Sequence, residues 1–182
     1  MNRLKKAVIV TRLARKMREK GSWCGETHLQ KALFLAQELF DVPTGFDFIL
    51  YKHGPFSFDL RDELTALRAD NLLTMEPQHP YGPRLATTPL SKELESRFPK
   101  TIQKIEPRLD FIADKLHGKG VVDLERLATA LYVIKQFPNC QSLNERALKL
   151  NELKPHVSIS DAEQAIEEIG EFQVQAKSLL AV

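Results

Sequence analysis

The feature that most constrains the fold of this chain is an apolar segment followed closely by a Gly-Pro corner. Residues 29–37 read LQKALFLAQ, and residues 51–57 read YKHGPFS. Apolar residues cover so much of the first segment that it predicts a helix buried on most of its surface. The second segment predicts a strand that ends before Pro55, because proline lacks a backbone N–H and restricts the residue before it. A buried helix, a short strand and a new helix, in this order, favour a winged-helix-like core.

The residues around this segment supply the other parts expected of such a core. Residues 3–19 show the spacing of an amphipathic helix, and the apolar helix is expected over 27–40, with Thr27 and Gln30 as its capping box. After the strand 46–52, Ser57 or Asp59 is expected to cap the next helix. Residues 72–76 and 84–88, joined by a Pro- and Gly-bearing tip, predict a β-hairpin that would be the wing.

Helical spacing then continues to the end of the sequence. Five helices are expected, over residues 91–98, 101–116, 121–137, 142–153 and 160–180, the last with a capping box of Ser160 and Glu163. No low-complexity linker divides the chain. We therefore predict a mainly α protein of the α+β kind, with a small three-stranded antiparallel sheet. A winged-helix-like part, 1–90, and a helical part, 91–182, are expected to share one core as a single domain.

Composition excludes some functional classes. The 182 residues carry a net charge of only +2, and no apolar run approaches the roughly twenty residues that a membrane span needs. The basic first segment has no continuous apolar core of the signal-peptide type. Cys24 and Cys140 are expected to be small hydrophobic fillers in a reducing compartment. We expect a cytoplasmic protein without a membrane partner.

Charge is distributed unevenly along the chain. Residues 1–20 hold eight Lys or Arg against one acid, whereas residues 160–182 hold five acids against one Lys. Arg12, Arg15 and Lys16 fall on one helix face, which we expect to be exposed and able to contact nucleic-acid phosphates. The alternative is a face that is only solvated, or one that forms salt bridges with the acidic last helix, within one subunit or between two.

The expected recognition helix has the wrong charge for reading DNA. After Pro55 it carries Asp59, Asp62, Glu63 and Asp70 against two arginines, and phosphates would repel such a helix. Groove reading by this helix is therefore disfavoured. DNA binding by the first helix stays open.

An aromatic corner is the candidate site for binding a partner. It comprises Tyr51, His53, Gly54, Pro55 and Phe56, and aromatic residues often concentrate the binding energy of an interface. The alternative is that these rings fill the core beneath the corner, with His53 bonded to the backbone.

The sequence offers no pattern of catalytic or metal-binding residues. The histidines are scattered, with no pair at a helical spacing of three or four and no Cys or carboxylate cluster around them: His28, His53, His79, His117 and His156. We therefore expect no catalytic residues, no metal and no cofactor, and we predict that the chain is not an enzyme.

The motifs described above resemble those of a known family. LQKALFLAQ, followed after a short gap by YKHGPFSFDLRDELTALRADNLL, is similar to the SocA-like, or Panacea, domain of prokaryotes and to the related YwgA-like and phage-associated proteins. Residues 150–155, followed by an acidic helix, resemble the C-terminal end of the YwgA-like members. The basic first helix and the long tip 77–83 depart from the usual pattern.

This resemblance implies a mostly helical fold with a small sheet. It also implies a non-enzymatic role as antitoxin, proteolytic adaptor or phage-defence component that binds another protein, namely a toxin, a protease or a further defence component. A homodimer is compatible with this role. The alternative function is that of a winged-helix transcriptional regulator that binds DNA through Arg12, Arg15 and Lys16.

Overall fold

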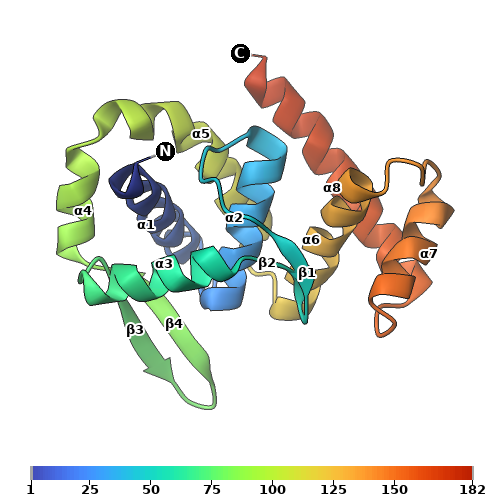
Figure 1. Cartoon of the computed structure of the whole chain (residues 1–182), viewed down its shortest axis with the longest axis horizontal. Coiled ribbons are helices and arrows are strands. Elements are labelled where there is room, and N and C mark those ends of the chain that lie inside the picture. Colours follow the sequence, from blue (N-terminus) through green and yellow to red (C-terminus); the bar gives the residue numbers. More distant parts are fainter. Residues whose placement is uncertain (1, 182) are drawn as a thin grey trace.

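The computed structural model describes residues 2–181, which form a mainly helical fold (Figure 1). This confirms the prediction of a mainly helical protein and the positions of the expected helices to within a few residues. The elements, in chain order, are α1 (Arg3–Glu19), α2 (Glu26–Phe40), β1 (Ile49–Tyr51), β2 (Gly54–Phe56), α3 (Phe58–Ala69), β3 (Leu73–Gln78), β4 (Tyr81–Thr87), α4 (Pro89–Ser96), α5 (Pro99–Leu116), α6 (Val121–Gln136), α7 (Leu143–Leu153) and α8 (Ile159–Leu180).

The strands form two separate antiparallel pairs, β1 with β2 and β3 with β4. The predicted three-stranded sheet is therefore wrong. The strand expected over 46–52 does end before Pro55, because β1 ends at Tyr51, but Gly54 and Pro55 belong to a second strand, β2, that was not predicted. Gly54 has a φ of +79°, which glycine tolerates, and the chain turns back so that Gly54 pairs with Tyr51. Both strands of a two-stranded sheet are edge strands, where proline is accepted. The winged-helix assignment stays a prediction.

The β3–β4 hairpin projects from the helical body (Figure 1). Its strands are longer, and its tip is shorter, than the sequence predicts, since β3 ends at Gln78 and β4 begins at Tyr81. The base of the hairpin is held to the body because the Leu85 N–H donates to the Cys24 carbonyl at 2.8 Å.

Two helices, α2 and α6, lie side by side at the centre of the fold (Figure 1). Residues 32–36 of α2 are buried, as the sequence predicts. One connected cluster of buried apolar residues includes members from both halves of the chain, such as Leu33, Phe40, Leu109, Leu131 and Ile169. The core therefore spans the expected boundary near residue 90.

The structure confirms one of the predicted helix caps and contradicts two others. Ser57 caps α3, as predicted. The boxes predicted at Thr27 and at Ser160 are wrong, because α2 begins after Gly25 and α8 is capped by Ser158. Gly25 is packed so closely that a Cβ there would lie 3.3 Å from Trp23 Cδ1 and 3.4 Å from the Pro83 carbonyl oxygen. A larger residue would therefore not fit at the N-cap of α2 without a shift of its neighbours.

Candidate functional site

The predicted partner-binding residues come together on the β1–β2 hairpin, which packs against α2 and α6 (Figure 1). Tyr51 and His53 are exposed, Phe56 is half-buried, and Gly54 and Pro55 are buried. One part of the corner therefore faces the solvent, while the glycine and the proline attach it to the body.

Four apolar side chains form an aromatic patch on the outer side of this hairpin: Ile49, Tyr51, Phe56 and Phe58. The three ring pairs have centroid separations of 5.2 to 5.6 Å. Tyr51 remains 50% exposed and Phe58 40% exposed, so these rings pack on one another without filling the core. Of the two sequence interpretations, the geometry favours a surface patch.

Two buried polar residues of α2 bind backbone groups at Pro55 in the corner and at Ser57 just after it. The Gln30 side-chain amide donates to the Ser57 carbonyl at 2.9 Å and accepts from the Ser57 N–H at 2.9 Å. Lys31 Nζ donates to the Pro55 carbonyl oxygen at 2.9 Å. Sequence reasoning missed both residues, although the adjacent Gln and Lys inside the apolar run LQKALFLAQ were a usable signal.

Lys31 is buried to an unusual degree for a lysine, with only 1% of its surface exposed. Burial disfavours the ammonium form and lowers the pKa of Lys31 to about 8, while the carboxylate of Glu125 acts in the opposite direction. The corner therefore rests on a cation that can lose its proton under mildly alkaline conditions.

Glu125 of α6 is the carboxylate at the centre of a second polar group beneath the hairpin. Its oxygens lie 3.5 Å from Lys154 Nζ, 3.3 Å from His156 Nε2 and 3.6 Å from His53 Nδ1. His53 thus faces a carboxylate, and the expected bond to the backbone is not among its contacts. Lys154 also donates to the carbonyl oxygens of Tyr51 and Lys52.

Gly54 touches α6 more closely than another residue could. A Cβ at this position would lie 2.9 Å from Thr129 Oγ1 and 3.3 Å from the Glu125 carbonyl oxygen. The Thr129 hydroxyl is buried and has no hydrogen-bond partner among residues 2–181. The close contact and the positive φ together explain why glycine stands at this corner.

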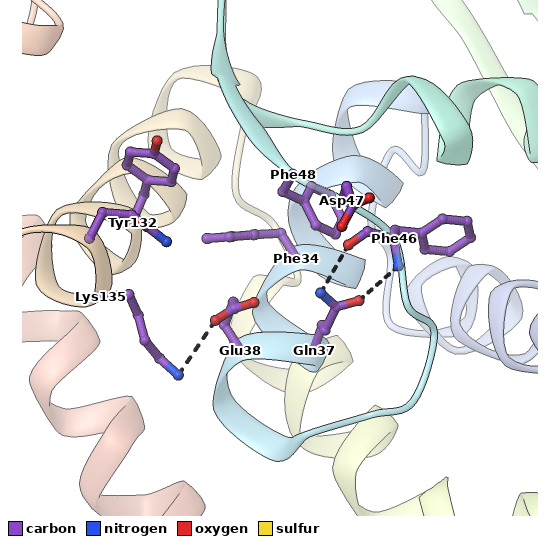
Figure 2. A pocket seen from close by; sticks show the side chains of 9 residues that line it. Phe34, Gln37, Glu38, Phe46, Asp47, Phe48, Tyr132 and Lys135 are labelled. Atoms are coloured by element: carbon purple, nitrogen blue, oxygen red, sulfur yellow. Dashed lines mark hydrogen bonds and ion pairs between the residues drawn. The ribbon is translucent and has the colours of Figure 1, made fainter. Parts of the chain in front are cut away.

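A small pocket of about 160 Å³ lies where the chain approaches β1 (Figure 2). Two pairings at this pocket are marked by the dashed lines in Figure 2: the Gln37 amide bonds both backbone groups of Phe46, and Lys135 lies 3.4 Å from Glu38. The rings of Phe34 and Phe48 pack in a T-shaped arrangement beside it. These contacts hold the segment that leads into the hairpin.

The three basic residues of α1 do not lie on an exposed face, so this expectation is wrong. The side chains of Arg12, Arg15 and Lys16 are 25%, 12% and 9% exposed. They face the carboxylates of α4 and α5, because α1 packs against these helices. They make no ion pair with the acidic last helix in the part of the chain that the structure describes.

Arg12, Arg15 and Lys16 form several ion pairs with the carboxylates of α4 and α5. Arg12 and Arg15 both contact Glu95, Arg12 also contacts Glu106, and Lys16 lies 2.6 Å from Glu106 and 2.5 Å from Asp110. Glu106 is partly buried, which alone would raise its pKa, but the hydrogen bonds from Arg12 and Lys16 lower the pKa overall. The positive charge of the face is thus matched by carboxylates.

The remaining ionisable groups offer little chemistry. Within residues 2–181, no group of three or more His, Cys, Asp or Glu side chains is arranged to hold a metal ion. Cys24 and Cys140 are free thiols, and burial raises the pKa of Cys24 to about 12. Over the same range, none of the helices combines the length and apolarity needed to cross a bilayer.

Comparison with known protein families finds no match, and comparison with curated proteins finds none either. The resemblance to the SocA-like domain therefore stays an interpretation of the motifs.

Proposed function

We propose that this chain is a non-enzymatic protein-interaction module of the antitoxin or adaptor type, acting in the cytoplasm within a prokaryotic toxin–antitoxin or phage-defence system. The observation that carries the proposal is the exposed aromatic patch of Ile49, Tyr51, Phe56 and Phe58. The resemblance to the SocA-like domain supplies the class of partner, namely a toxin, a protease or another defence component.

The patch is well suited to binding because its backbone is held in place before any partner arrives. Gln30, Lys31 and Lys154 each bond backbone groups of the hairpin or of the residue after it. A pre-organised surface loses little conformational entropy on association, so more of the contact energy appears as affinity. Exposed aromatic rings on such a support are typical of the residues that dominate interface energetics.

The charges beside the patch indicate the chemistry of the partner segment. Lys52, His53 and His156 are exposed, and Glu125, the carboxylate that lies within 3.6 Å of both histidines, is buried. We therefore expect a polypeptide segment with apolar side chains on the patch and an acidic side chain next to them.

The test is co-expression with the product of the adjacent gene, which is the natural candidate partner. Replacing both Tyr51→Ser and Phe58→Ser should reduce the affinity about tenfold or more, since two exposed rings are lost, and should remove protection if that product is toxic. The matched control is Val174→Ser on α8, where an apolar side chain is 65% exposed. Circular dichroism should show that all variants fold.

Two results would contradict the proposal. The first is a partner that binds the double variant and the native chain equally well. The second is protection from a toxic neighbour that survives the double variant but is lost in the Val174 control, because the interface would then lie on α8.

The alternative function, a DNA-binding regulator that uses Arg12, Arg15 and Lys16, has less support. Each of these side chains already pairs with carboxylates of α4 or α5, so phosphate contacts would have to compete with those pairs. An electrophoretic mobility assay at two salt concentrations tests this alternative. Salt-sensitive duplex binding that is lost on reversing the three charges would establish it.

A further inference from the structure

A second concave region lies on a different part of the molecule. It is an open cleft of about 840 Å³ between the beginnings of α2 and α6 and the tip of the β3–β4 hairpin, and its walls include Trp23, His28, Tyr81, Pro83, Lys119 and Val121. Figure 1 shows the first turn of α2, in blue, between the hairpin and α6. None of the four residues of the aromatic patch lines this cleft.

One wall of the cleft is aromatic. The rings of Trp23 and Tyr81 meet edge to face with centroids 5.3 Å apart, and Tyr81 is 70% exposed. The Arg84 guanidinium lies over the Trp23 ring, 5.1 Å from its centroid, and donates to the Trp23 carbonyl oxygen at 3.1 Å. Trp23 is thus oriented, and this wall can stack a planar ring.

The opposite side contains the N-termini of two helices. Both α2 and α6 begin after a glycine, Gly25 and Gly120, and neither helix has a side-chain acceptor on the N–H groups of its first turn. Such N–H groups lack an intrahelical partner, and with the helix dipole they favour an anion. Asp123 accepts only from the Gly120 N–H, at 3.3 Å.

His28 is the observation that distinguishes this cleft from an ordinary pair of helix ends. It is only 4% exposed, it lines the cleft, and its ring has no hydrogen bond or ion pair within residues 2–181. Neither ring nitrogen belongs to the fully buried side-chain atoms that lack a partner in this range, so both nitrogens can be reached by water or by a ligand in the cleft. Burial of the side chain lowers the pKa of His28, which favours the neutral imidazole with one N–H to donate. A bound ligand would replace water at this N–H.

The charges at the cleft are mixed, and one Lys and one Glu line it. Lys119 lies on one side, although it also pairs with Glu168 at 2.8 Å, and Arg84 lies behind Trp23. The exposed carboxylate of Glu26 is the acidic group that lines the cleft. Glu26 would therefore weaken the binding of an anion without preventing it, because it is solvated.

We propose that this cleft binds a small anion that carries a planar ring, of the mononucleotide class. The ring would lie against Trp23 and Tyr81, the phosphate would accept from the first-turn N–H groups of α2 and α6, and His28 would donate to the same ligand. The volume lies within the range of about 300 to 1,000 Å³ that is usual for small-molecule sites. Several N–H donors favour a phosphate, which offers several acceptor oxygens.

The experiment uses the full chain and its only tryptophan, Trp23, as a fluorescent reporter. The chain is titrated with AMP, GMP and inorganic phosphate, with adenosine as the matched compound that lacks the phosphate. We expect saturable quenching by at least one nucleotide, and weak or absent quenching by adenosine and by inorganic phosphate. The exposed corner variant Tyr51→Ser should bind the nucleotide normally.

Two substitutions test the assigned contacts. His28→Leu should weaken nucleotide binding about tenfold, the effect expected for one lost hydrogen bond from a buried donor. Glu26→Gln, at an exposed position that does not endanger folding, should strengthen binding severalfold because a repelling charge is removed.

Three outcomes would overturn the proposal. They are the absence of saturable quenching by either nucleotide at millimolar concentration, equal affinity for adenosine and AMP, and nucleotide affinity unchanged in both the folded His28→Leu variant and the Glu26→Gln variant. None of them bears on the aromatic patch, so the two proposals can fail separately.

Discussion

The basic face of α1 and the β1–β2 corner differ in how the fold treats their charges and rings. Both were candidate surfaces in the sequence. Arg12, Arg15 and Lys16 turn inward, where carboxylates of α4 and α5 neutralise them. Tyr51 on the hairpin and Phe58 at the start of α3 stay half-exposed, and the hairpin backbone is held from beneath. A cluster of charges along one helix therefore says little about exposure until the neighbouring helices are known.

The two regions also use their cations differently. On α1, Arg12, Arg15 and Lys16 each face at least one carboxylate. Beneath the corner, Lys31 and Lys154 bond backbone carbonyl oxygens. Glu125 lies close to Lys154 and to two histidines, and its charge also favours the ammonium form of Lys31. The first arrangement stabilises the packing of helices, whereas the second holds a loop in a defined shape. Three substitutions test whether the two regions differ in this way.

The largest expected loss of stability comes from breaking the ion pairs around α1. Glu95 is 3% exposed and contacts both Arg12 and Arg15. Glu95→Gln leaves two partly buried guanidinium groups without their shared carboxylate, so the free energy of unfolding should fall by about 3 kcal/mol. Urea denaturation of the native chain and of the variant measures this fall in the free energy of unfolding.

The control for this prediction lies on the same helix. Glu93 pairs with Arg97 on the surface, and both side chains are more than half exposed, 57% and 68%. Glu93→Gln should change stability by less than about 0.5 kcal/mol. Equal effects at the two positions would mean that the α1 pairs add nothing beyond ordinary surface charges.

The second-largest expected loss of stability comes from a substitution at Gly54 in the β1–β2 corner. In Gly54→Ala the new methyl would meet Thr129 Oγ1 at 2.9 Å at a φ of +79°, so a loss of about 2 kcal/mol is expected, with weaker partner binding. Gly45→Ala, which has a φ of +62° and nothing within 4 Å, should cost only about 1 kcal/mol. Similar losses in the two variants would show that the contact with α6 does not constrain the hairpin.

The smallest effect is a dependence on pH. The pKa of Lys31 falls from 10.5 to about 8 in the folded chain, so between these values the unfolded chain binds more protons and stability rises with pH. Relative to Lys31→Met, the native chain should gain about 1 kcal/mol between about pH 8 and about pH 9.

Chemical denaturation of both proteins at the two pH values measures this gain, and the subtraction cancels the titration of other groups. Lys100→Met, at an exposed lysine, provides the control and should track the native chain. If Lys31→Met shows the same slope as the native chain, the buried amine does not titrate in this window.

Much of the fold could be predicted from the sequence because helix formation follows local apolar spacing. The helices at 3–19 and 142–153 lie within one residue of their expected bounds. The sheets were predicted less well, since Ile49–Tyr51 pairs with the three residues after His53 and not with the wing. Strand pairing depends on non-local geometry, here on the reversal at Gly54.

The candidate site was predicted in part. The five residues of the corner were identified, because aromatic residues around a Gly-Pro pair are visible in any sequence. Glu125, Lys154 and His156 were missed, since they reach the hairpin from α6 and from the residues after α7, about seventy or more positions away along the chain. No local pattern marks such residues.

The sequence by itself determined where the helices lie and that α2 would be buried, because both follow from the spacing of apolar residues. Only the tertiary structure decided which face of α1 is covered and where the charges of Arg12, Arg15 and Lys16 end. It also decided that Lys31 is buried beneath Pro55. Burial and ion pairing depend on side chains distant in sequence, so they arise only when the helices pack.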